Sequence, residues 1–246
     1  NGIVYESKES AEKSAIAAEV SDTSTKAKLF KTKSTFKKSE ACKKNKDFTK
    51  KLDYAKSFPM PGMLNTNVAE FGCGTMIPQG ITVAKSYFFI TAYDSQGIEN
   101  SVVYVLSKAD KELMTTIILP NKSHAGGIAF DGKNLWITQA KTLRSIPFSA
   151  VKDAIDNQEP YLELSAYGVE INLPQQAATV TYYKKLLWVA SYDELKPGYL
   201  VSYKIAKKGS KPELTPLKTI SMPTRVQGIA FSGNGRLIVS RSCQTD

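Results

Sequence analysis

The chemistry open to this chain depends on its single histidine, His124. A hydrolase of the Ser-His-Asp type needs its histidine beside a nucleophile. Ser123 precedes His124, but adjacent residues of an extended chain point to opposite sides, and the sequence contains no G-x-S-x-G motif. One histidine also cannot build a histidine-rich metal site. The sequence therefore assigns no catalytic residue, and His124 is either a ligand-binding residue or a structural or merely exposed one.

Two Tyr-Asp pairs, Tyr93-Asp94 and Tyr192-Asp193, end strand-like segments. Their carboxylates could hold a cation such as Ca²⁺, or a sugar. The alternative is that each aspartate caps its turn through backbone N–H groups, and we favour it. Together with nearby glutamines they complete the set of candidate ligand-binding residues: His124, Gln79, Asp94, Tyr93, Gln176, Asp193, Tyr192 and Gln227.

An internal repeat indicates which elements position these side chains. Four stretches share one pattern: Pro78–Asp94, Ala125–Lys141, Ala177–Asp193 and Val226–Cys243. Their anchor residues are 47, 52 and 49 positions apart, at Gly80, Gly127, Thr179 and Gly228. A period near 50 residues with several strands in each unit is typical of a β-propeller. The glycines then mark the entry of each blade, where the first strands crowd together.

Each unit reads as a short apolar strand, a polar turn and a second strand, at residues 81–91, 128–138, 180–191 and 229–240. The turns "DGKN" and "SGNG" favour tight hairpins. Third and fourth strands are expected at 101–108, 114–120, 199–207 and 217–223, and Ile146–Ile155 reads as a strand that runs into a short helix. The prediction is an all-β β-propeller over residues 58–246, with four blade units of about 50 residues. The last unit is incomplete, which points to truncation of a five- or six-bladed parent.

Basic charge is concentrated ahead of this domain, in a predicted leader at residues 1–57. The formal net charge is +10, and residues 26–57 alone contain twelve lysines and three acidic residues. Such a segment could bind a polyanion or a lipid surface, or it could be a solvated leader. We favour the solvated leader and expect no nucleic-acid partner, because the segment has no arginine for bidentate contacts. Residues 1–25 are expected to be disordered or loosely helical.

Cysteine usage and hydropathy add little chemistry. Cys42, Cys73 and Cys243 include no C-x-x-C pair, so a metal knuckle or redox motif is not expected. A disulfide between Cys42 and Cys73 is one possibility, and three unpaired thiols are the other. No stretch reaches the roughly 18 apolar residues of a membrane span. The chain begins with Asn rather than Met, so a longer precursor is expected, and a signal peptide could have preceded residue 1.

Several stretches resemble one family of secreted bacterial β-propellers that has no established activity. They are "SHAGGIAFDGKNLWIT", "IPFSAVKDAI", "LLWVASYDELKPGYLVSYKI" and "RVQGIAFSGNGRLIVSRS". The resemblance covers residues 58–246, and it implies an extracellular location and a parent that continues past this chain. More distantly the sequence is similar to the gluconolactonase and streptogramin lyase propellers. It has no motif that matches the acidic metal ligand of the lactonases.

These observations predict a secreted, non-catalytic binding or scaffold module that acts at the channel face. Its ligand would be a glycan, a small molecule or a protein, and the chain is expected to be a monomer without a cofactor. The alternative is a lactonase- or lyase-like enzyme that uses His124, Asp94 and Asp193 at the channel mouth, with Ca²⁺ as the possible metal. A third hypothesis is that the leader attaches the protein to anionic surfaces.

Overall fold

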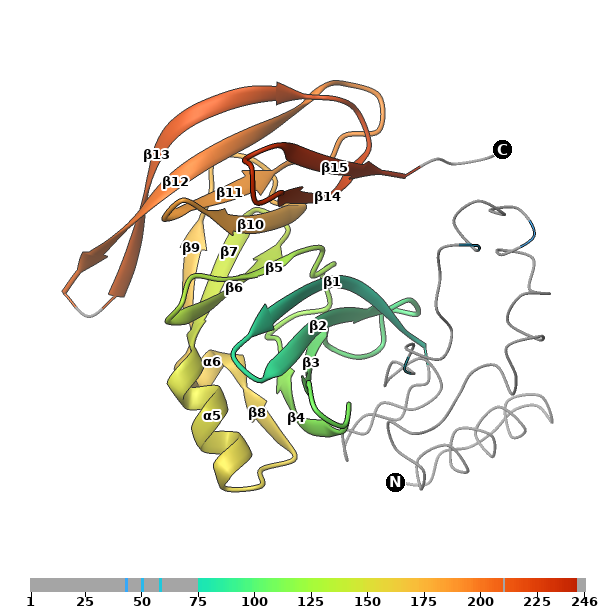
Figure 1. The fold of residues 1–246 in the computed structure, drawn as a ribbon, viewed down its shortest axis with the longest axis vertical. Coiled ribbons are helices and arrows are strands. Elements are labelled where there is room, and N and C mark those ends of the chain that lie inside the picture. Colours follow the sequence, from blue (N-terminus) through green and yellow to red (C-terminus); the bar gives the residue numbers. More distant parts are fainter. Residues whose placement is uncertain (1–42, 44–49, 51–57, 59–74, 210, 243–246) are drawn as a thin grey trace.

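The computed structural model describes residues 43, 50, 58, 75–209 and 211–242 of the chain (Figure 1). This part is all-β, with strands grouped into four sheets and two short helices. The first sheet begins with four antiparallel strands: β1 (Met76–Ala84), β2 (Tyr87–Asp94), β3 (Val102–Ser107) and β4 (Leu113–Ile118). The second contains β5 (Ile128–Phe130), β6 (Asn134–Gln139), β7 (Thr142–Pro147) and β9 (Val169–Asn172).

The third sheet contains β10 (Thr179–Tyr183), β11 (Leu186–Ala190), β12 (Gly198–Lys208) and β13 (Lys211–Met222). The fourth contains β14 (Val226–Phe231) and β15 (Leu237–Arg241). Each of the four repeat units predicted from the sequence therefore forms the start of a separate antiparallel sheet. The first strands are neighbours in chain order, with β1 beside β5, β5 beside β10, and β10 beside β14.

The glycines at the repeat anchors permit this close approach of first strands. A Cβ on Gly127 would lie 2.5 Å from the backbone nitrogen of Val180 in the next sheet, and a Cβ on Gly80 would lie 3.0 Å from the Cα of Gly127. A Cβ on Gly126 would collide with the carbonyl oxygen of Ala178. The prediction that glycine is needed where the strands crowd together is confirmed at these positions.

In the first two sheets a threonine hydroxyl on the second strand accepts the backbone N–H of the anchor glycine. The backbone N–H of Gly80 donates to Thr91 Oγ1 at 2.8 Å, and that of Gly127 donates to Thr138 Oγ1 at 2.8 Å. In the third sheet the two roles are exchanged, because Thr179 on the first strand pairs with Ala190 on the second. A hydroxyl and a small residue therefore face each other at the entry of these sheets.

Buried apolar side chains fill the space between consecutive sheets. The cluster between the first two sheets includes Phe89, Ile117, Ile128 and Ile137. Two further clusters join the second sheet to the third and the third to the fourth, through residues such as Trp136, Tyr203, Val189, Leu200, Met222 and Ile229. Each sheet thus buries both faces where it has a neighbour on both sides, so the relative placement of the sheets is set by packing.

An excursion between β7 and β9 links the first two sheets. The predicted strand followed by a helix is confirmed as β7 and α5 (Phe148–Asp156), and α5 buries Val151, Ala154 and Ile155 in the first cluster. Beyond it the chain forms β8 (Tyr161–Glu163), which pairs in parallel with β4 and extends the first sheet. It then returns through α6 (Leu164–Tyr167) to β9. The sequence did not predict β8 or β9.

The hairpin β12–β13 is longer than the sequence predicted, because β13 begins at Lys211 rather than at Leu217. Two prolines, Pro212 and Pro216, lie in the added part, and proline normally argues against a strand. Proline is tolerated here because β13 is the outer strand of its sheet in the described part of the chain. The register also shifts opposite Pro216, between Ser202 and Tyr203.

The turn between β10 and β11 carries a removable strain. Tyr183 pairs with Leu186, which leaves Lys184 and Lys185 as a two-residue loop with φ of 49° and 63°. Such turns favour Asn-Gly, because positive φ is energetically unfavourable for most residues, whereas Asn and Gly tolerate it. We expect the double variant Lys184→Asn/Lys185→Gly to raise the free energy of unfolding by about 1–2 kcal/mol in urea denaturation.

The matched control for this prediction is Lys184→Ala/Lys185→Ala. It removes the same two charges but keeps side chains at both positive-φ positions. If the alanine variant gained as much stability as the Asn-Gly variant, charge rather than backbone strain would be the cause.

Some sequence predictions fall outside the described residues. They include the disulfide between Cys42 and Cys73 and almost all of the leader 1–57. Among the described residues, no helix has the length and apolar character to cross a membrane.

Candidate functional site

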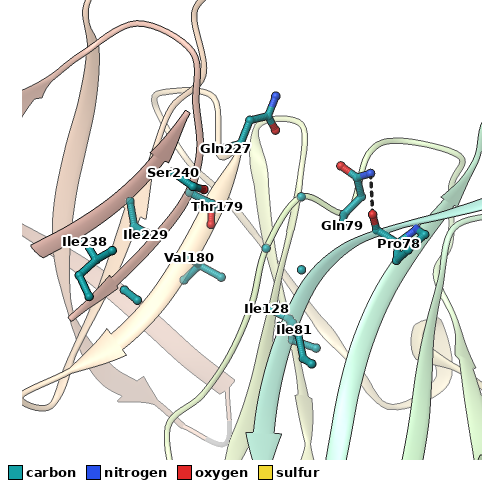
Figure 2. Close-up of a pocket in the computed structure, with 15 residues that line it drawn as sticks. Pro78, Gln79, Ile81, Ile128, Thr179, Val180, Gln227, Ile229, Ile238 and Ser240 are labelled. Atoms are coloured by element: carbon teal, nitrogen blue, oxygen red, sulfur yellow. Dashed lines mark hydrogen bonds between the residues drawn. The ribbon is translucent and has the colours of Figure 1, made fainter. Parts of the chain in front are cut away.

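A cavity of about 430 Å³ lies among the first strands of the four sheets. Gln79 and Gln227 extend from one end of it, while Ile81 and Ile128 lie further along (Figure 2). Hydroxyl groups of Thr179 and Ser240 and the anchor glycines complete much of its wall. Gln79 Nε2 donates to the carbonyl oxygen of Pro78 at 3.0 Å. The cavity therefore combines amide and hydroxyl groups with backbone and isoleucine surface.

The repeat register explains which predicted residues line this cavity. Gln79 and Gln227 directly precede their anchor glycines, and both line it. His124 and Gln176 stand three residues before their anchors, and neither lines it. The sequence predicted all four as ligand-binding candidates, but they stand at two different offsets from the anchors, and the two residues at the shorter offset line the cavity. Gln176 is exposed, while the amide of its neighbour Gln175 donates to the hydroxyl of Tyr203 at 2.5 Å.

His124 and Tyr93 stack on each other, with ring centroids 3.8 Å apart and an interplanar angle of 24°. Tyr93 is on β2, on the same face as Phe89, which packs in the cluster between the first two sheets. That face directs Tyr93 towards the loop before β5, where His124 lies exposed. Two residues that the sequence singled out separately, from different repeat units, are thus in direct contact.

Asp94 is buried and caps the turn after β2 with both carboxylate oxygens. Its Oδ1 accepts from Thr75 Oγ1 at 2.6 Å and from the Gln96 N–H at 3.1 Å. Its Oδ2 accepts from the N–H groups of Ile98 and Glu99 at 2.8 and 3.0 Å. Burial alone would raise the pKa of Asp94, but these four hydrogen bonds to the charged form lower the pKa below its ordinary value. The turn-capping alternative is confirmed for this residue.

Asp193 has the same role with fewer partners. Its Oδ1 accepts from the N–H groups of Lys196 and Leu195 at 2.8 and 2.9 Å, and these bonds lower the pKa of the carboxyl. Tyr192 beside it is half-buried. No group of three or more His, Cys, Asp or Glu residues that could hold a metal ion is found in the described part of the chain. His124, Asp94 and Asp193 therefore do not form such a group.

Arg225 is a candidate ligand-binding residue that the sequence did not single out. It stands three residues before Gly228, as His124 stands three residues before Gly127. Its N–H donates to the carbonyl oxygen of Asp193 at 2.7 Å, and its guanidinium pairs with Glu194 at 3.4 Å. A comparison of equal offsets from the anchors would have found it.

No protein-family model and no curated protein matches this chain. A solved chain from the crystal structure of the mitotic checkpoint complex is similar at 14% identity with a TM-score of 0.44, over 67% of this chain and 46% of that chain. The chain thus spans about half the length (46%) of that solved chain. The resemblance to secreted bacterial propellers stays a prediction.

Proposed function

We propose that the four sheets are blades of a β-propeller and that the chain is a non-catalytic binding module. The order of the first strands supports this proposal, because β1, β5, β10 and β14 are successive neighbours and all contribute to one cavity. Propeller modules commonly take ligands at the channel face. The secreted location and the five- or six-bladed parent, both expected from the sequence, belong to the same proposal.

The Tyr93–His124 stack is the observation that carries the binding function. An exposed imidazole supported from behind by a phenol ring offers a flat apolar face with polar edges. Tyr93 pairs with Ile77 near the start of β1, and two positions further along this strand Gln79 offers an amide at the cavity, as Gln227 does on β14. Flat rings combined with neutral amides and hydroxyls suit a neutral oligosaccharide, whose C–H faces stack on rings and whose hydroxyl groups need both donors and acceptors.

The contacts of the aspartates weigh against the enzyme alternative. That hypothesis needs Asp94 and Asp193 as reacting carboxylates or metal ligands. Asp94 instead accepts three backbone N–H groups of its own turn and the hydroxyl of Thr75, and Asp193 accepts two backbone N–H groups. A carboxylate held by several donors is stabilised as a turn cap and would have to lose those bonds to react.

Titration calorimetry with cellotetraose, xylotetraose and chitotetraose tests the binding function. We expect at least one of these probes to bind, and Tyr93→Ala to weaken that binding about tenfold or more, because the variant removes the support of the imidazole. Tyr167→Ala is the matched control, since Tyr167 is an exposed tyrosine on α6, an element that packs on β7 rather than on the Tyr93–His124 stack. Absence of binding by all three probes, or equal losses in both variants, would overturn the oligosaccharide proposal.

A further inference from the structure

The loop that presents His124 is held from both neighbouring sheets by hydrogen bonds. Asn121 Oδ1 accepts from the Ser123 N–H at 3.1 Å, from Ser123 Oγ at 2.6 Å and from Gln139 Nε2 at 2.8 Å. One amide oxygen thus organises both the loop and its attachment to β6. Gln139 is the last residue of β6 and is only 1% exposed, so its amide position is fixed by packing.

The first sheet holds the same loop from its other side. The N–H of the buried Ser101 donates to the Asn121 carbonyl oxygen at 3.0 Å. The hydroxyl group of Ser101 donates to the carbonyl oxygen of Ser123 at 2.5 Å. Asn121 and Ser123, three residues and one residue before His124, therefore have donors or acceptors fixed to β6 and to Ser101, just before β3. A loop with this many anchors has little freedom to move its next side chain.

From this geometry we infer that Asn121 and Gln139 are positioning residues that hold His124 on Tyr93. They act through the loop: Gln139 places the Asn121 amide, and Asn121 places the Ser123 backbone. His124 follows Ser123 directly, so its ring is delivered to the face of Tyr93 before any ligand arrives. The inference deepens the proposed function, because it makes the stacking face preformed rather than assembled on binding.

The side-chain oxygen of Asn121, Oδ1, accepts the three hydrogen bonds from Ser123 N–H, Ser123 Oγ and Gln139 Nε2. This predicts a specific pattern of rescue. Aspartate has an oxygen in the same place and can accept the same hydrogen bonds, so Asn121→Asp should preserve the loop. Alanine cannot accept them, so Asn121→Ala should release it. A residue that only filled space would not distinguish these two variants in this way.

The single histidine makes the test direct. In the full chain, we expect carbon–proton correlation NMR to show one set of imidazole signals, and we expect the ring current of Tyr93 to displace them relative to Tyr93→Leu. We expect Asn121→Ala and Gln139→Leu to lose most of this displacement, and Asn121→Asp to retain it. Gln175→Leu is the matched control, because Gln175 donates to Tyr203 and makes no bond to the Asn121–His124 loop.

The inference is overturned if folded Asn121→Ala keeps the displacement, or if Asn121→Asp loses as much as Asn121→Ala. Gln139 is buried, so Gln139→Leu could fail to fold. Asn121 is half-buried, and the comparison of Asn121→Ala with Asn121→Asp then decides the question. No ligand is present in this experiment, so its failure leaves the proposed function standing. Failure of the oligosaccharide titration likewise leaves the positioning inference standing.

Discussion

Gly127→Ala is expected to lower the free energy of unfolding by about 3 kcal/mol or more. The added Cβ would lie 2.5 Å from Val180 N and 2.7 Å from Thr179 Cα. Both atoms belong to the backbone of β10, which pairs with β11 and cannot yield as a side-chain tip would. The overlap must therefore separate β5 from β10 and loosen the packing of the second sheet on the third. Urea denaturation followed by circular dichroism measures the loss.

Gly233→Ala is the control for this substitution. A Cβ at Gly233 meets no heavy atom within 4 Å, and its φ is not in the left-handed region. Its effect should stay within about 0.5 kcal/mol. If Gly127→Ala were equally mild, the close approach of the first strands would not be a constraint on the fold.

Asp94→Asn is expected to destabilise the protein by about 1–3 kcal/mol at neutral pH. The variant keeps one side-chain oxygen but replaces Oδ2 with an amide nitrogen. The N–H groups of Ile98 and Glu99 then face a donor instead of an acceptor. Asp193→Asn is the control, because the hydrogen bonds described for Asp193 use Oδ1 alone, which asparagine can retain.

The same carboxylate predicts a pH dependence. The pKa of Asp94 is lower in the folded protein than its ordinary value. Its contribution to stability is therefore fully present above the unfolded pKa, near 3.9, and is lost as the pH falls through the folded pKa. The stability difference between the unsubstituted protein and Asp94→Asn should shrink as the pH is lowered below about 4. A difference that stays constant or grows in acid would contradict this account of Asp94.

Local sequence signals predicted the repeated hairpins and their anchors well. Gly127 and Thr138 are eleven residues apart and meet within one hairpin, so the pattern of a single unit contains their contact. The turn residues Gly132 and Gly235 have positive φ, as the "DGKN" and "SGNG" segments indicated. Strand pairing by tight turns depends on neighbouring residues, and a single sequence records those.

Features that depend on distant segments were missed. The three-residue strand β8 pairs in parallel with β4, and so short a strand has no periodicity to detect. Pro212 and Pro216 argue against a strand in the sequence, but the outer position of β13 in its sheet permits one. The sequence singled out Tyr93 and His124 separately, but their contact depends on how two sheets pack, which no local pattern encodes.

The central claim is that a ligand binds on the Tyr93–His124 face. Titration of the full chain with the oligosaccharide that binds in calorimetry, followed through the imidazole signals of His124, tests it most directly. We predict saturable displacement of these signals, with the midpoint found by calorimetry, and loss of that displacement in Tyr93→Ala. Calorimetric binding that leaves the His124 signals unchanged would place the ligand elsewhere and contradict the account.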